Sequence, residues 1–146
     1  MNIFNLIDRG SKHARDYAKA KEEKEVADRC EVAREQWITA LSADEIRAWM
    51  DIGEDAKDVV QGLATVLTLV GLAHSFDTND SNSVEVRIIR SAISAAEQCA
   101  KEGCVMTPAY AASFSAAVSY AKEMASAASH QGITNACLYL RKQVAQ

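Results

Sequence analysis

The stretch VVQGLATVLTLVGLAHSF, residues 59–76, is the most apolar part of the 146-residue chain. Its 18 positions include five polar residues: Gln61, Thr65, Thr68, His74 and Ser75. Because a helix that spans a bilayer needs about 20 predominantly apolar residues, we predict no membrane span here. A helix that is apolar on nearly every side is typical of the centre of a helical domain, where neighbours contact it from several directions. The stretch therefore predicts a central core helix.

The central helix is expected to cover about residues 54–75. It begins after Gly53 with acidic side chains, which stabilise the positive N-terminal end of a helix. These carboxylates are Glu54, Asp55 and Asp58. Before them, Ser42 and Glu45 form a capping box, which predicts a short helix from Ala43 to about Met50.

A long first helix is indicated by residues 11–41, which contain no Pro and no Gly. An apolar stripe with helical spacing runs along its second half, at Val26, Cys30, Ala33, Trp37 and Ala40. The same spacing continued backwards meets only charged residues. We therefore expect residues 11–25 to project as a charged helical arm with little core contact.

The charges of this first helix are balanced, with eight acidic and eight basic residues between Asp8 and Glu35. A solvated helix face is the simpler interpretation of such a pattern. The alternative is a docking arm that binds a partner, with Tyr17 and an apolar N-terminal cluster as anchors. That cluster consists of Ile3, Phe4, Leu6 and Ile7, and we expect it to be buried in the core or in a partner.

The second half of the chain predicts three further helices. Residues 77–83 are polar and read as a loop, after which Ser83 can cap a helix over 84–101 with Val86, Ile89, Ile93, Ala96 and Ala100 facing the core. Thr107 and Pro108 start the next helix, with an inward stripe at Phe114, Val118, Ala121, Ala125 and Ala128. Gly132 and Thr134 separate a last helix over 135–145, with Cys137, Leu140 and Val144 inward. The sequence thus predicts one all-α domain, residues 1–146, as a bundle of five or six helices.

The charge, the N-terminal sequence and the cysteines argue against several classes of function. A net charge of −4 argues against binding along a nucleic-acid backbone, which needs clustered Lys and Arg. The N-terminus reaches charged residues too soon for a secretory signal, so we expect a cytoplasmic protein. Four cysteines with no C-x-x-C spacing are expected to be structural thiols, and no histidine stands beside them to complete a zinc site.

No nucleotide-binding glycine loop, zinc-protease motif or serine nucleophile motif occurs in the chain. One set of carboxylates could hold Mg²⁺ if two helices brought them together: Glu22, Glu25, Asp55 and Asp58. Solvated charges and acidic helix starts explain the same residues more simply. We therefore expect no cofactor in the leading interpretation.

The segments EEKE (22–25) and EDAKDVVQGLATVL (54–67) resemble the E-x-x-E and E-x-x-D motifs of the all-α nucleotide pyrophosphatases of the MazG type. The resemblance implies a Mg²⁺-dependent hydrolase with Glu22, Glu25, Asp55 and Asp58 as metal ligands. The second motif starts with Asp where the family has Glu, and the interval between the motifs is long. This enzyme is the alternative hypothesis.

The leading hypothesis is a small non-enzymatic interaction protein that binds and regulates or inhibits another protein. Residues 42–80 hold eight acids and two bases, whereas residues 81–146 hold four acids and six bases. An acidic face of Asp51, Glu54, Asp55 and Asp58 would suit a basic partner. Compact chains of this type are typical of phage or mobile-element accessory inhibitors, such as anti-defence, anti-CRISPR-type or immunity proteins. A third hypothesis, compatible with either, is a homodimer.

Overall fold

The computed structural model describes residues 3–42 and 56–145, with side chains described for 19–42 and 57–144. Within these ranges the chain forms five helices and no strand: α1 (Ile3–Ala40), α3 (Ala56–Thr78), α4 (Val84–Lys101), α5 (Pro108–Ala127) and α6 (His130–Ala145). The predicted all-α class is therefore confirmed. The helix expected over 43–50 lies outside the described residues.

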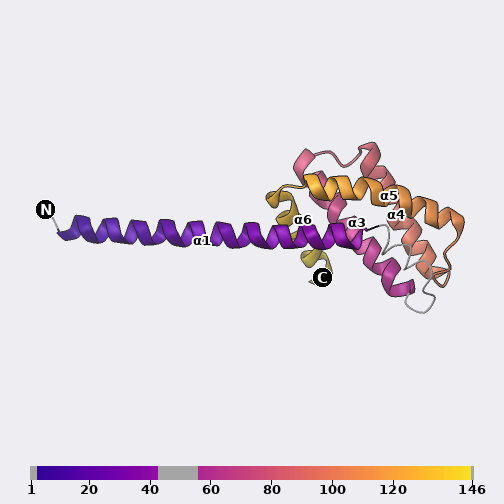
Figure 1. Cartoon of the computed structure of the whole chain (residues 1–146), viewed down its shortest axis with the longest axis horizontal. Coiled ribbons are helices and arrows are strands. Elements are labelled where there is room, and N and C mark those ends of the chain that lie inside the picture. The colour runs from indigo at the N-terminus through magenta and orange to yellow at the C-terminus, as the bar shows by residue number, and fades with distance from the viewer. Residues whose placement is uncertain (1–2, 43–55, 146) are drawn as a thin grey trace.

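Helix α3 is the centre of the bundle, as its apolar sequence predicts. It contacts all four other helices, and its fully buried side chains recur every three or four residues: Val60, Leu63, Leu67, Val70 and Ala73. By length and composition alone, Lys57–Thr78 would be long and apolar enough to cross a membrane. In this structure 28% of its apolar 18-residue window is buried, and its buried residues belong to the core. The other helices lie around α3 (Figure 1).

Helix α4 has the predicted bounds because both of its ends are fixed locally. The Ser83 side chain accepts a hydrogen bond from the Val86 N–H (3.3 Å) at the start. At the other end the Cys104 N–H donates to the Cys99 carbonyl (2.8 Å), and Gly103 adopts a positive φ of 87°. The inward stripe differs in part from the prediction, since Ala92 and Cys99 are buried where Ile93 and Ala100 were expected.

Helix α5 also starts as predicted, with Thr107 as N-cap and Pro108 in the first turn. The whole predicted stripe from Phe114 to Ala128 is buried, together with Ala117 and Met124. Many of these residues are alanines, which allow α5 to pack closely against α4 and α3.

Two expectations about the chain after the central helix were wrong. Asp77 and Thr78 belong to the last turn of α3 and not to the loop. Helix α6 begins at His130, five residues earlier than predicted, because the Ser129 side chain accepts a hydrogen bond from the Gly132 N–H (2.9 Å) and caps the helix. Gly132 is therefore a residue of the first turn and not a break.

The expected inward face of α6 was also wrong at its C-terminal end. Ile133 and Ala136 are the buried residues, while Cys137 and Leu140 are half-buried and Val144 is 79% exposed. The buried core ends before the last two turns of the helix, where Leu140 is still half-buried and Val144 is exposed. In Figure 1, α6 crosses α1, and the C-terminus of the chain lies on the other side of α1 from the start of α6.

Helix α1 is a single helix of 38 residues, about 57 Å long at 1.5 Å per residue. Only its C-terminal part packs on the bundle, through Cys30 and Trp37, and Leu41 directly after the helix is buried as well. Its N-terminal part extends away from the other helices (Figure 1). The core stripe begins one turn later than expected, since Val26 is 40% exposed.

Candidate protein-binding helix

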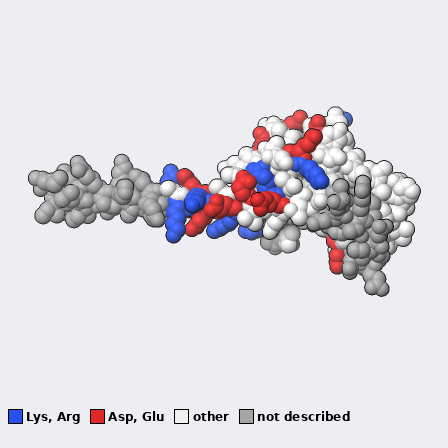
Figure 2. Space-filling view, in the orientation of Figure 1, with Lys and Arg blue, Asp and Glu red and all other residues white. Residues whose placement is uncertain are grey.

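The most exposed regular element of the molecule is the middle of α1. From Lys19 to Arg29 every side chain is exposed except Ala27, which is half-buried. Figure 2 shows Lys and Arg intermixed with Asp and Glu where this stretch leaves the bundle. The residues before Lys19 continue the same helix to Ile3.

Helix α1 also has an exposed face where it packs on its own bundle. Glu25, Arg29, Val32, Gln36 and Thr39 follow one another at spacings of three and four, and all five side chains are exposed. Val32 is a large apolar side chain on this face and is 54% exposed. The core residues Cys30 and Trp37 lie on another side of the helix. A continuous exposed face therefore runs from the free part of α1 onto the bundle.

A polar corner fixes the place where α1 meets the bundle. The Arg34 guanidinium donates hydrogen bonds to the Ala125 carbonyl (2.7 Å) and the Ser126 carbonyl (3.0 Å) at the end of α5. A cation at this position also faces the negative end of the α5 dipole. Arg34 therefore joins α1 to the C-terminus of α5.

Glu31 completes this corner. Its carboxylate accepts hydrogen bonds from Arg34 Nε (3.2 Å) and His130 Nε2 (2.7 Å), so it links α1 to the first turn of α6. The hydrogen bond from His130, followed by that from Arg34, lowers the pKa of Glu31 below its ordinary value. Next to Glu31 in the sequence, the Cys30 thiol lies 3.3 Å from the hydroxyl of Thr134, one turn after His130. Together these contacts set the direction in which α1 leaves the bundle.

The structure describes two of the five residues predicted to bind a partner. Tyr17 lies on α1, where only the backbone is described. Asp58 is exposed in the first turn of α3, and α3 begins at the end of the bundle opposite to the free part of α1 (Figure 1). Asp51, Glu54 and Asp55 lie outside the described residues. Tyr17 and Asp58 therefore do not share one surface.

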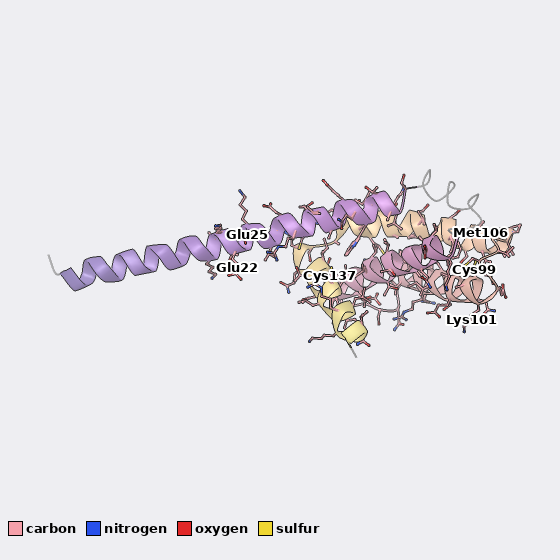
Figure 3. The ribbon with its side chains drawn as sticks, turned by 90° about the horizontal axis from the view of Figure 1, so that it is seen from below. Glu22, Glu25, Cys99, Lys101, Met106 and Cys137 are labelled. Carbon is pink, nitrogen blue, oxygen red and sulfur yellow. The ribbon has the colours of Figure 1, made fainter. Side chains whose placement is uncertain are left out.

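The carboxylates of the magnesium hypothesis are not brought together either. Glu22 and Glu25 are exposed on the part of α1 beyond the bundle (Figure 3), far from the first turn of α3 that carries Asp58. Asp55 lies outside the described residues. Among the side chains that the structure describes, no three of His, Cys, Asp or Glu lie close enough to share a metal ion.

A second exposed surface was missed from the sequence, where α6 passes over α3. The rings of Phe76 and Tyr139 meet edge to face with centroids 6.3 Å apart, and both remain about half exposed. The same two helices also line a shallow groove of about 410 Å³, formed by Leu69, Cys137, Leu140, Arg141 and Val144. The spacing of 137, 140 and 144 indicates this face, although the same spacing is also typical of a core stripe.

Comparisons of the chain with protein family models, with curated proteins and with solved structures find no match.

Proposed function

We propose that this protein is a non-enzymatic interaction protein that binds another protein through α1 and regulates or inhibits it. The observation that carries the proposal is the exposure of α1 from Lys19 to Arg29, within a helix that continues to Ile3. A helix that is polar all round and lacks tertiary contacts is only marginally stable in water. A partner that packs against α1 would supply the missing contacts.

The charge balance of α1 supports a protein as the partner. With eight acids and eight bases between Asp8 and Glu35, the helix lacks the excess of Lys and Arg that neutralises a phosphate backbone. Intermixed charges of both signs suit a protein surface, which also carries both signs. The apolar residues Val26 and Val32 add exposed contact area to the same helix.

The polar corner at Glu31 and Arg34 supports recognition by a fixed element. Because α1 is held to both α5 and α6, its free part leaves the bundle in one direction. A binding helix that is anchored at one end loses less freedom of orientation on association than one attached through a mobile linker. In this proposal the bundle holds α1 in place for the partner. The protein would act as an accessory inhibitor from a phage or mobile element.

Photo-crosslinking tests the proposal. A photoreactive amino acid is placed at Tyr17 or Val26, which lie on opposite sides of α1 at about 100° per residue. The matched control is Arg90, an exposed position on α4. In cells that naturally express the protein, we expect adducts with a different protein from positions 17 and 26 and not from position 90. The activity of that protein should change when the purified full chain is added.

Adducts with a second copy of the chain alone, or adducts from position 90 as strong as those from 17 and 26, would contradict the proposal.

A further inference from the structure

Two of the four cysteines lie where α4 ends, Cys99 in its last turn and Cys104 in the connection to α5. Two backbone hydrogen bonds shape this end of the helix. The Gly103 N–H donates to the Ala100 carbonyl (3.3 Å), and the Cys104 N–H donates to the Cys99 carbonyl (2.8 Å). With Glu102 as the C-cap and Gly103 at a φ of 87°, this is a Schellman motif. Cys99 and Cys104 are therefore the two residues that its outer hydrogen bond joins.

The side chains at these two positions of a Schellman motif frequently contact each other. The backbone hydrogen bond holds the Cα atoms of Cys99 and Cys104 about 6 Å apart, a separation that disulfides accept. The Cys99 thiol points towards the connection, because it donates to the carbonyl of Val105 (3.8 Å), the residue directly after Cys104. The fold therefore places two thiols at a distance from which they can be joined.

Further contacts hold this turn in one shape. Glu102 accepts hydrogen bonds from the Gln98 side chain (3.0 Å) and from the Tyr110 hydroxyl (2.5 Å), so it connects the turn to both α4 and α5. Met106 packs against the core. Figure 3 shows Cys99 and Met106 at the end of the bundle opposite to the free part of α1. The folded structure, and not only the short separation in sequence, keeps the two cysteines near each other.

Cys104 has an unusual backbone conformation for a residue with a side chain. Its φ is 62°, in the left-handed region that favours Gly and Asn. Helix capping does not require a cysteine here, because Gly or Asn adopts this conformation at lower cost. The Cys104 side chain is partly exposed, whereas that of Cys99 is fully buried. A reagent in solution therefore reaches Cys104 first.

We propose that Cys104 and Cys99 form a reversible disulfide when a hydroperoxide oxidises the protein, so that the α4–α5 turn is a redox-sensitive modification site. The Cys104 thiolate attacks the peroxide, becomes a sulfenic acid and releases an alcohol, or water from hydrogen peroxide. The Cys99 sulfur then attacks the sulfenic sulfur, forms the S–S bond and releases water. The two thiols lose two electrons, which reduce the peroxide. This inference goes beyond the proposed function and does not depend on it.

The environment of Cys99 supports this order of steps. Burial, followed by the nearby Cys104 and Glu102, raises the pKa of the Cys99 thiol. A protonated thiol is a poor nucleophile, so Cys99 does not react with the peroxide itself. Oxidation also removes the hydrogen that Cys99 donates to the Val105 carbonyl. Val105 is 65% exposed, so the surface of the turn changes with the redox state.

Peptide mapping tests the pairing on the purified full chain. Trypsin cleaves after Lys101, so Cys99 and Cys104 fall on separate peptides, residues 91–101 and 102–122. After treatment with hydrogen peroxide and alkylation of the free thiols, we expect these two peptides to be linked. Dithiothreitol should separate them, and Cys104→Ser should abolish the link.

The other two cysteines are internal controls, because Cys30 and Cys137 fall on two further tryptic peptides, residues 30–34 and 123–141. Both should remain open to alkylation at a peroxide dose that links the first pair. Peroxide treatment that leaves Cys99 and Cys104 free, or that links two copies of residues 102–122, would overturn the proposal.

The unfolded chain separates proximity in the fold from proximity in the sequence. In a glutathione redox buffer, the ratio of disulfide to dithiol at Cys99 and Cys104 should be roughly tenfold higher or more in the folded chain than in concentrated urea, because the fold holds the thiols together. This measurement uses the wild-type chain alone. Equal ratios in the two states would refute the pairing by the fold.

Trapping of the sulfenic acid tests the order of the steps. Dimedone, which reacts with sulfenic acids, should label Cys104 roughly tenfold more in Cys99→Ser than in the wild type, because the thiol that consumes the sulfenic acid is gone. The serine hydroxyl retains a donor for the Val105 carbonyl, and circular dichroism checks that the helices persist. Equal labelling of Cys104 in the two chains would contradict the role of Cys99.

Discussion

Oε1 of Glu31 on α1 lies 2.7 Å from Nε2 of His130 in the first turn of α6, so a contact between residues 99 positions apart joins the long helix to the end of the chain. The same carboxylate binds Arg34, whose guanidinium reaches the last carbonyls of α5. Three helices therefore meet at one charged corner, at the point where α1 leaves the bundle.

The pH dependence of stability should reveal the role of Glu31. Its pKa in the folded protein lies below the ordinary value of 4.5 because His130 and Arg34 donate hydrogen bonds to the carboxylate. A lowered folded-state pKa gives a stabilisation that is fully present above about pH 4.5 and is lost as the pH falls through the folded-state value. Glu31→Gln should therefore lower the melting temperature at neutral pH, and its difference from wild type should shrink on acidification.

Glu35→Gln is the control, since Glu35 is an exposed carboxylate one turn further along α1. Its melting temperature should follow that of the wild type at every pH. A Glu31→Gln deficit that stays constant down to acidic pH would show that the carboxylate charge is not responsible.

Arg34 should contribute more to stability than Arg29, the other arginine of α1 whose side chain the structure describes. Its side chain is only 15% exposed and donates to the Ala125 and Ser126 carbonyls. Arg34→Met retains the aliphatic part of the side chain but removes the hydrogen bonds to both carbonyls and to Glu31, so urea unfolding should show a loss of about 1.5–3 kcal/mol. Arg29→Met, at an exposed position one turn earlier, should change the free energy of unfolding by less than about 0.5 kcal/mol. Equal effects of the two substitutions would contradict the capping role of Arg34.

Tyr110 should ionise at unusually high pH. Its hydroxyl donates a 2.5 Å hydrogen bond to Glu102 Oε2, and this bond, with a smaller effect of burial, raises the pKa of Tyr110 to about 12. The difference in ultraviolet absorbance between wild type and Tyr110→Phe isolates this phenol during a titration. Because the pKa is raised in the folded state, the stabilisation is present below pH 10 and is lost as the pH rises towards 12.

Glu102→Gln tests the cause of this shift. Without the carboxylate, the titration midpoint of Tyr110 should move down towards its ordinary value of 10. Circular dichroism recorded alongside confirms that the helices persist during the titration. A midpoint that remains near 12 in Glu102→Gln would assign the shift to burial and not to the hydrogen bond.

The sequence predicts the fold well where the deciding signals are local. The apolar run 59–76 identifies the central helix, and the caps Ser83 and Thr107 place the starts of α4 and α5, because each signal acts within a few residues. The predicted start of α6 was too late because a glycine such as Gly132 usually disfavours the interior of a helix. Here the space of its missing side chain is occupied by the carboxylate of Asp77, 55 positions earlier in the chain. No local sequence pattern indicates such a contact.

The candidate site was predictable only in part for the same reason. The charged residues 19–25 indicate an exposed stretch, since no apolar stripe passes through them. Carboxylates at i,i+3 spacing, such as Glu22 with Glu25, show which side chains share a helix face but not which helices are neighbours. The corner formed by Glu31, Arg34 and His130 depends on how three helices meet, so it could not be read from any one segment.

Gly132 should resist replacement by alanine because the Asp77 carboxylate occupies the space of a Cβ. A Cβ at this position would lie 2.8 Å from the carboxyl carbon of Asp77, closer than van der Waals contact allows. The Asp77 carboxylate accepts hydrogen bonds from the Ser129 backbone N–H (2.8 Å) and from its hydroxyl, at the N-terminus of α6. Gly132→Ala should displace this carboxylate and lower the free energy of unfolding, measured in urea, although alanine favours the helix by about 1 kcal/mol.

Gly62 on α3 is the matched control, because it is exposed and a Cβ there would meet no atom within 4 Å. Gly62→Ala should therefore stabilise the protein by about 0.5–1 kcal/mol, the usual gain from alanine within a helix. A double-mutant cycle identifies the cause of the Gly132 effect. In a chain that already carries Asp77→Ala, the obstructing carboxylate is gone, so Gly132→Ala should become neutral or stabilising. If Gly132→Ala were equally destabilising in both backgrounds, the conflict would lie elsewhere in the packing of α6 and not with Asp77.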